Sequence, residues 1–154
     1  MKNNILFLSA VLLAGLSSCS KSTDKPGSDN QWTFKETSHI AKSVTAYETG
    51  SKITATDGLN TVTVRFFRNL PTAAGTYKVV ADAPAAANEV SVQATTDKKL
   101  QYITRINDTN VKASVTLSKD IIRVRFSGVR VMALPKYNDT VLVSATLQET
   151  QRNK

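Results

Sequence analysis

The chain has 154 residues, of which 41% are hydrophobic and 21% are charged. These proportions are typical of one globular domain and argue against wholesale disorder. The formal net charge is +8, which is typical of a protein kept soluble beside a membrane and also allows a polyanionic partner, and the single cysteine excludes an internal disulfide.

The amino terminus has the pattern of an export signal. Lys2 precedes an apolar stretch, residues 5–16, that is too short to span a bilayer, which takes about 20 residues, and has the size of a signal-peptide core. Leu16-Ser17-Ser18-Cys19 follows directly. This sequence resembles the lipobox of bacterial lipoproteins, which implies cleavage before Cys19, a diacylglyceryl group on its thiol and palmitate-type acylation of its new α-amine. We therefore predict a signal peptide over 1–18 and lipid attachment at Cys19.

The residues after Cys19 are small, polar or charged as far as Asn30, which predicts a flexible tether over 19–30. Such a segment extends to about 35 Å. Ser20 stands where inner-membrane retention signals often carry Asp, so we expect anchoring in the outer membrane, at either the periplasmic face or the cell surface. The polyanions met there are lipid head groups and acidic polysaccharides, so the positive charge does not indicate nucleic acid.

From Gln31 to the end of the chain, apolar and polar residues alternate with period 2, which predicts strands. Trp32 is expected to insert into the core, and 83–88 is expected to form a loop or a single turn. Asp57-Gly58 and Glu48-Thr49-Gly50 are turn sequences that predict antiparallel neighbours. The predicted strands cover 38–47, 51–56, 61–67, 76–80, 89–94, 100–106, 111–117, 122–131 and 141–147.

One predicted strand changes phase. Ile122, Val124 and Phe126 share one parity, whereas Val129 and Val131 take the other. A bulge at Gly128 restores a single buried face, so Gly128→Val is expected to destabilise the domain; a strand crossing between two sheets is the alternative. With about nine or ten strands over 31–154, the sequence predicts an all-β fold. We expect a single antiparallel β-sandwich, with a small up-and-down β-barrel as the alternative.

Several short segments also carry a likeness to known sequences. They are the lipobox, Trp32-Thr33-Phe34, Lys52-Ile53-Thr54-Ala55-Thr56, Leu70-Pro71 with Gly75-Thr76-Tyr77, and Arg125-Phe126-Ser127-Gly128-Val129. In this order they resemble a set of small uncharacterised all-β lipoproteins of Gram-negative bacteria. The resemblance implies anchoring and architecture, and it transfers no functional residue.

The sequence lacks the residue sets of most catalytic sites. His39 is the only histidine and Cys19 the only cysteine, so no His/Cys cluster can hold a transition metal. G-x-S-x-G, phosphate-loop and EF-hand patterns are absent, and most acidic residues fall at predicted turns, where Asp is favoured structurally. We predict no catalytic residue, no metal and no cofactor, and we expect His39 at the surface or on an edge strand.

The candidate ligand-binding residues are Arg65, Arg123, Arg125 and Arg130, which all take the polar parity of their strands once the bulge is allowed. In one sheet they would form a cationic face suited to sulfate, phosphate or uronate groups. The alternative is a solvated strand face whose charges discourage aggregation.

The sequence therefore predicts a membrane-anchored, non-catalytic binding or adaptor domain. Its candidate partners are an acidic glycan or an envelope protein, in addition to the membrane that holds the anchor. A small-molecule carrier with a barrel cavity and a structural envelope component are the alternatives.

Overall fold

The computed structural model describes residues 30–105 and 110–154 and confirms the all-β fold, with twelve strands and no helix in those ranges. Cys19, the tether and most of the predicted turn over 107–110 lie outside the described residues. The strands are β1 (Gln31–Phe34), β2 (Thr37–Ile40), β3 (Ser43–Tyr47), β4 (Lys52–Thr56), β5 (Thr61–Phe66), β6 (Gly75–Val79), β7 (Glu89–Thr95), β8 (Gln101–Ile103), β9 (Lys112–Ser118), β10 (Ile121–Ala133), β11 (Thr140–Gln148) and β12 (Gln151–Asn153).

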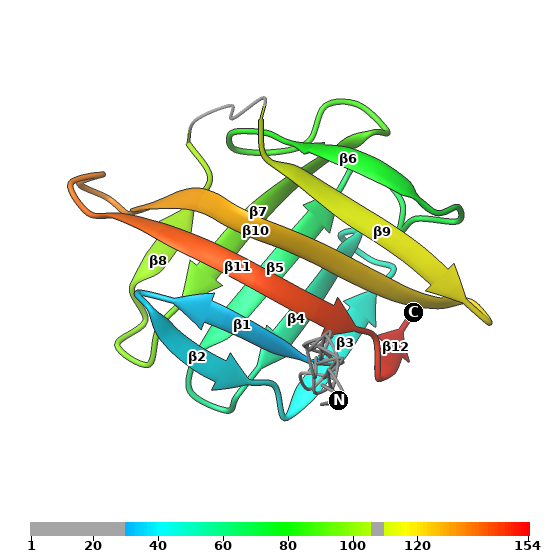
Figure 1. Cartoon of the computed structure of the whole chain (residues 1–154), viewed down its shortest axis with the longest axis horizontal. Helices are drawn as coiled ribbons and strands as arrows, with labels where there is room; N and C mark the ends of the chain where they lie inside the picture. Colours follow the sequence, from blue (N-terminus) through cyan, green and yellow to red (C-terminus); the bar gives the residue numbers. More distant parts are fainter. Residues whose placement is uncertain (1–29, 106–109) are drawn as a thin grey trace, which may run out of the picture.

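The strands form one continuous sheet in the order β12-β3-β4-β5-β7-β6-β9-β10-β11-β1-β2. Figure 1 shows the sheet folded into a front layer of β9, β10, β11, β1 and β2 over a back layer of β3, β4, β5 and β7. The short strand β8 pairs with both β7 and β10, which closes a ring of five strands, β7-β6-β9-β10-β8. The fold therefore combines a two-layered arrangement with a small closed barrel.

Two local features differ from the sequence prediction. The run predicted as one strand over 38–47 forms β2 and β3, because the chain crosses between the layers at Ala41 and Lys42. β1 and β12 were not among the predicted strands, and β12 pairs in parallel with β3, as β6 does with β7. The predicted hairpins are confirmed: β3–β4 and β4–β5 are antiparallel, and Asp57 Oδ1 accepts the backbone N–H groups of Leu59 and Asn60 at 2.8 and 2.7 Å.

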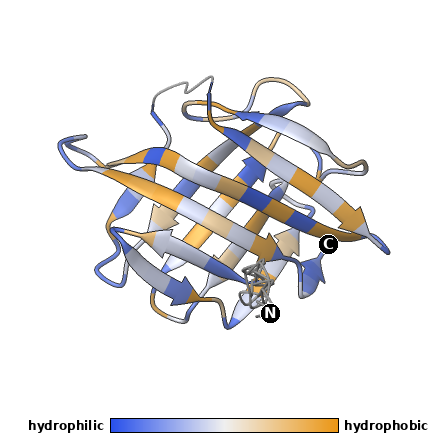
Figure 2. Ribbon diagram, in the orientation of Figure 1, coloured by the Kyte–Doolittle hydropathy of each residue, from blue (hydrophilic) through white to orange (hydrophobic). Residues whose placement is uncertain are grey.

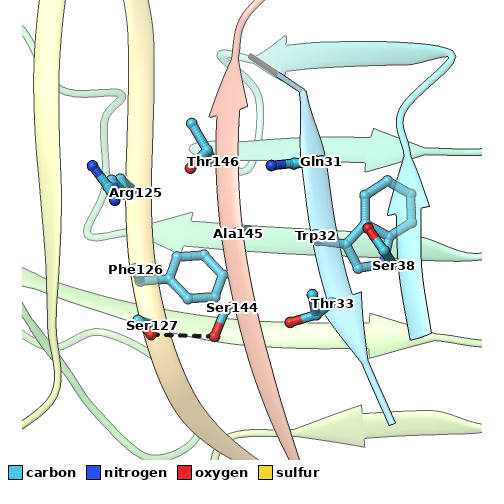
Figure 3. A pocket seen from close by; sticks show the side chains of 10 residues that line it. All are labelled: Gln31, Trp32, Thr33, Ser38, Arg125, Phe126, Ser127, Ser144, Ala145 and Thr146. Carbon is cyan, nitrogen blue, oxygen red and sulfur yellow. Dashed lines mark hydrogen bonds between the residues drawn. The ribbon is translucent and has the colours of Figure 1, made fainter. Parts of the chain in front are cut away.

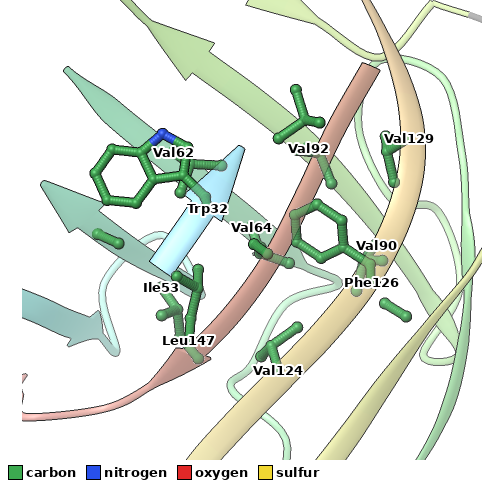
Figure 4. Close-up of a cluster of buried hydrophobic side chains, with 14 of the residues drawn as sticks. Trp32, Ile53, Val62, Val64, Val90, Val92, Val124, Phe126, Val129 and Leu147 are labelled. Atoms are coloured by element: carbon green, nitrogen blue, oxygen red, sulfur yellow. The ribbon is translucent and has the colours of Figure 1, made fainter. Parts of the chain in front are cut away.

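The apolar side chains at alternate positions of the strands fill the space between the two layers. Trp32, which was predicted to enter the core, is 1% exposed. Figure 4 shows it with Leu147, Val124 and Phe126 of the front layer, opposite Ile53 and valines of the back layer. Figure 2 shows the matching alternation of hydrophilic and hydrophobic bands along β9, β10 and β11. Burial of each large side chain contributes about 1.5–3 kcal/mol to folding.

The bulge predicted in β10 is confirmed. Phe126 pairs with Ala145, but Val129 pairs with Val143, so two residues of β10 lie opposite Ser144. Gly128 has φ +68°, a left-handed conformation that glycine adopts without cost, and its N–H donates to Ser144 Oγ at 2.9 Å. The bulge absorbs the extra residue, so the apolar side chains on both sides of it stay inside the core.

A polar corner after β11 connects the two layers. The Glu149 carboxylate, whose side chain is 8% exposed, accepts the Ile122 N–H of β10 and two N–H groups of Arg152. Thr150 donates its backbone N–H to the Val44 carbonyl of β3 at 2.8 Å. Burial acts to raise the pKa of Glu149, but the Arg152 guanidinium and the Ile122 N–H outweigh it, so the pKa is lowered.

We expect Gly128→Ala to reduce the free energy of unfolding by about 1–2 kcal/mol, the cost of placing a Cβ in a left-handed conformation. A Cβ at Gly128 would meet no atom within 4 Å, so the effect arises from the backbone and not from a clash. Gly75→Ala is the matched control, because Gly75 has no positive φ and its Cβ would make an ordinary contact with Tyr77. Urea denaturation measures both variants; equal small losses would contradict the role assigned to the bulge.

Candidate functional site

The four candidate arginines occupy two different layers. Arg123, Arg125 and Arg130 are exposed at outward positions of β10 in the front layer. Arg65 is exposed on β5 in the back layer, between Lys52 of β4 and Ser91 of β7. Since outward side chains of the two layers point in opposite directions, the structure brings three of the four arginines together and leaves Arg65 apart.

We call the outward side of β9, β10, β11 and β1 the cationic face. Its positive residues are Lys112, Arg123, Arg125 and Arg130, and no outward position of these four strands carries Asp or Glu in the part of the chain that the structure describes. The other outward side chains are mostly Ser, Thr and Gln. Lys112 was not a candidate in the sequence analysis, although the alternation over 111–117 places it on the polar side of the predicted strand.

A shallow depression of about 200 Å³ lies on this face, and we call it the trough. Figure 3 shows that residues from β10, β11, β1 and β2 line it. Strand register arranges its polar side chains in two rows that run across the strands. The first row holds Arg125, Thr146 and Gln31; the second holds Ser127, Ser144, Thr33 and Ser38.

The hydrogen-bonding capacity of the trough is largely unused. Ser144 Oγ accepts the Gly128 N–H and lies 3.4 Å from Ser127 Oγ, as the dashed line in Figure 3 marks. Arg125 and Thr33 make no side-chain hydrogen bond or ion pair with any residue that the structure describes. The guanidinium offers two parallel N–H donors to a carboxylate or sulfate, and the hydroxyls can both donate and accept.

A second cleft of about 260 Å³ continues the polar surface around Arg123. Thr116 and Ser118 of β9 and Gln148 of β11 line it with that arginine. Arg123 and Arg125 are two residues apart on one strand, so the cleft and the trough lie side by side along β10. The hydroxyl residues of the trough and the cleft were not predicted from the sequence. Only the pairing of β9, β10, β11 and β1 brings these side chains together.

His39 belongs to a different arrangement, at the edge of the sheet. It is on the terminal strand β2, as predicted, but its side chain is only 14% exposed. The ring stacks on Trp32, with centroids 5.1 Å apart, and Nδ1 donates to Asp57 Oδ2 at 2.8 Å. Ser38 points to the other side of β2 because successive strand residues alternate. The contact therefore joins β2 to the β4–β5 turn of the back layer.

The Asp57 carboxylate is held in its charged form. Burial acts to raise its pKa, but hydrogen bonds from the Asn60 backbone, the Asn60 side chain, the Leu59 backbone and His39 hold the pKa well below its usual value. The turn at Asp57-Gly58 and the edge of the front layer are thereby fixed to each other.

No three His, Cys, Asp or Glu side chains converge as a metal site within 30–105 and 110–154. A helix long and apolar enough to cross a membrane is likewise not found in those ranges.

Comparisons with protein-family models, with curated proteins and with solved structures return no match for the chain. The resemblance to small lipoproteins thus stays a prediction.

We expect the domain to lose stability in acid. The pKa values of Asp57 and Glu149 are lowered in the folded state, so the unfolded chain binds more protons as the pH falls below about 4. Their contribution is fully present above about pH 5 and is lost as the pH falls through the folded-state pKa values. Urea denaturation at pH 6 and pH 3 should show a smaller acid-induced loss for Asp57→Asn than for the wild type. An unchanged loss would show that Asp57 does not couple to folding.

Proposed function

We propose that the chain is an exported lipoprotein, anchored in the outer membrane through acyl chains on Cys19, and that its β domain is a non-catalytic module that binds acidic glycans through the cationic face. One observation carries the binding proposal: the outward positions of β9, β10, β11 and β1 include four cations and, within these described strands, no acid. The electrostatic potentials of like charges on one face add, and the summed positive potential attracts a polyanion.

The shape of the face supports a polymer as the ligand. β10 is 13 residues long, and its three arginines lie along the strand on both sides of the bulge. Charged groups repeated along a glycan chain can meet such a row one after another. The neighbouring Ser, Thr and Gln side chains match the hydroxyl groups that a glycan carries between its charges.

The point at which the chain enters the domain supports a ligand at the membrane surface. The chain enters the domain at Asn30, whose side-chain oxygen accepts the N–H of Gln148 at 2.6 Å, and Gln31 already lines the trough. The predicted tether therefore joins the domain beside the cationic face. Acidic polysaccharides and lipid head groups are the polyanions expected at that location.

The carrier alternative has less support from the described residues. A ring of five strands is narrower than the barrels of about eight strands that hold one small ligand. Buried side chains from its own strands, including Tyr102, Val90, Val115 and Val129, fill the ring.

We expect Arg123→Ser/Arg130→Ser to weaken binding to an acidic glycan. Full-length chain, purified in non-ionic detergent, is passed over immobilised polygalacturonate, with neutral dextran as the reference surface. Each exposed ion pair contributes about 0.2–1 kcal/mol, so we expect the double variant to raise Kd about fivefold to tenfold. Wild-type binding should also weaken as sodium chloride is raised, because salt screens exposed charges.

The matched control is Lys52→Ser/Arg65→Ser, which removes two positive charges from the outward side of the back layer. We expect this control to bind polygalacturonate like the wild type. Equal losses for the two double variants would show that net charge and not the cationic face determines binding. Absence of binding by the wild type would reject the proposed ligand class.

A further inference from the structure

We infer that the trough is a subsite for one uronate residue of the glycan, with the sugar carboxylate on Arg125 and the ring hydroxyls on the row formed by Ser127, Ser144, Thr33 and Ser38. This inference rests on the proposed function and deepens it. The cationic face alone would attract any polyanion, whereas the trough distinguishes a sugar acid from a simple anion.

The size of the trough fits one sugar ring. Its volume is about 200 Å³, below the roughly 300–1,000 Å³ of sites that enclose a drug-sized ligand. It is open on the outer side, so the remaining sugars of a chain can leave it in either direction along the surface. The cleft around Arg123 is next to it on the same strand and can receive a neighbouring residue.

The two rows match the two sides of a hexuronate ring. They are separated by two residues along each strand, about 7 Å, which places the guanidinium of Arg125 on one side of the trough and the hydroxyls on the other. A hexuronate has the same arrangement, with its carboxylate at one side of the ring and ring hydroxyls at the opposite side. The amide of Gln31, beside Arg125 in the first row, can donate to the ring or carboxylate oxygens.

The polar side chains of the trough have unused hydrogen-bonding capacity, which supports a ligand there. Arg125 has no carboxylate partner among the described residues, and the side-chain hydroxyls of Thr33 and Ser38 make no hydrogen bond there. Ser144 is fixed by the Gly128 N–H, so the bulge orients one hydroxyl of the second row. A polar pocket built in this way favours ligands that offer complementary hydroxyls over ligands that lack them.

The test compares trigalacturonate with tripolyphosphate, a linear anion without hydroxyl-bearing rings, by isothermal titration of the full-length chain in detergent. Thr33→Val/Ser38→Ala removes two hydroxyls and no charge. We expect this variant to raise Kd for trigalacturonate about fivefold and to leave Kd for tripolyphosphate within about twofold. Thr61→Val, on the outward side of β5 in the back layer, is the control and should change neither value.

A second variant tests the guanidinium. Arg125→Lys keeps the charge but loses the planar pair of donors, which fits carboxylate and phosphate alike, so we expect weaker binding of both trigalacturonate and tripolyphosphate. If Thr33→Val/Ser38→Ala weakens both probes equally, or neither, or if Arg125→Lys leaves trigalacturonate binding unchanged, the trough is not a uronate subsite, although the proposed function stands while trigalacturonate binds. If the wild type binds neither probe, the proposed function fails together with this inference.

Discussion

The bulge at Ser127 and Gly128 determines which side chains of β10 reach the core and which reach solvent. Without the bulge, regular alternation along β10 would turn Val129 and Val131 outward and Arg130 inward. With it, the apolar residues on both sides of the bulge are buried, and all three arginines of the strand face outward. Because β10 pairs with β8, β9 and β11, its register also positions the strands that form the rest of the front layer.

The closures at the ends of the sheet complete this arrangement. The ring through β8 joins β10 to β7, the Glu149 corner joins β10 to β3, and the contact between His39 and Asp57 fixes β2 to the back layer. These contacts use the side chains of Glu149, His39 and Asp57 to hold the layers together. The Ser, Thr, Gln and Arg side chains of the trough lie on the outer face, where they can bind a ligand.

Much of the fold follows from local patterns in the sequence. The alternation gave most strand positions, the turn at Asp57-Gly58 gave a hairpin, and the change of phase around Gly128 gave the bulge. The break at Ala41 was hidden because the run over 38–47 alternates on both sides of it. The alternation predicted that the four arginine side chains point outward, but it could not predict that Arg65 lies in the opposite layer from the other three. The trough was beyond prediction, since its two rows exist only through the pairing of β10, β11, β1 and β2.

Hydrogen–deuterium exchange of the full-length chain, with and without oligogalacturonate, tests the central claim that the cationic face is the binding surface. Backbone amides report where a ligand slows local opening, and the measurement needs no substitution that could disturb the fold. The account predicts added protection concentrated in β10, β11 and β1, with β4 and β5 of the back layer unchanged. Protection centred on the back layer, or on the loops between β5 and β7, would contradict it.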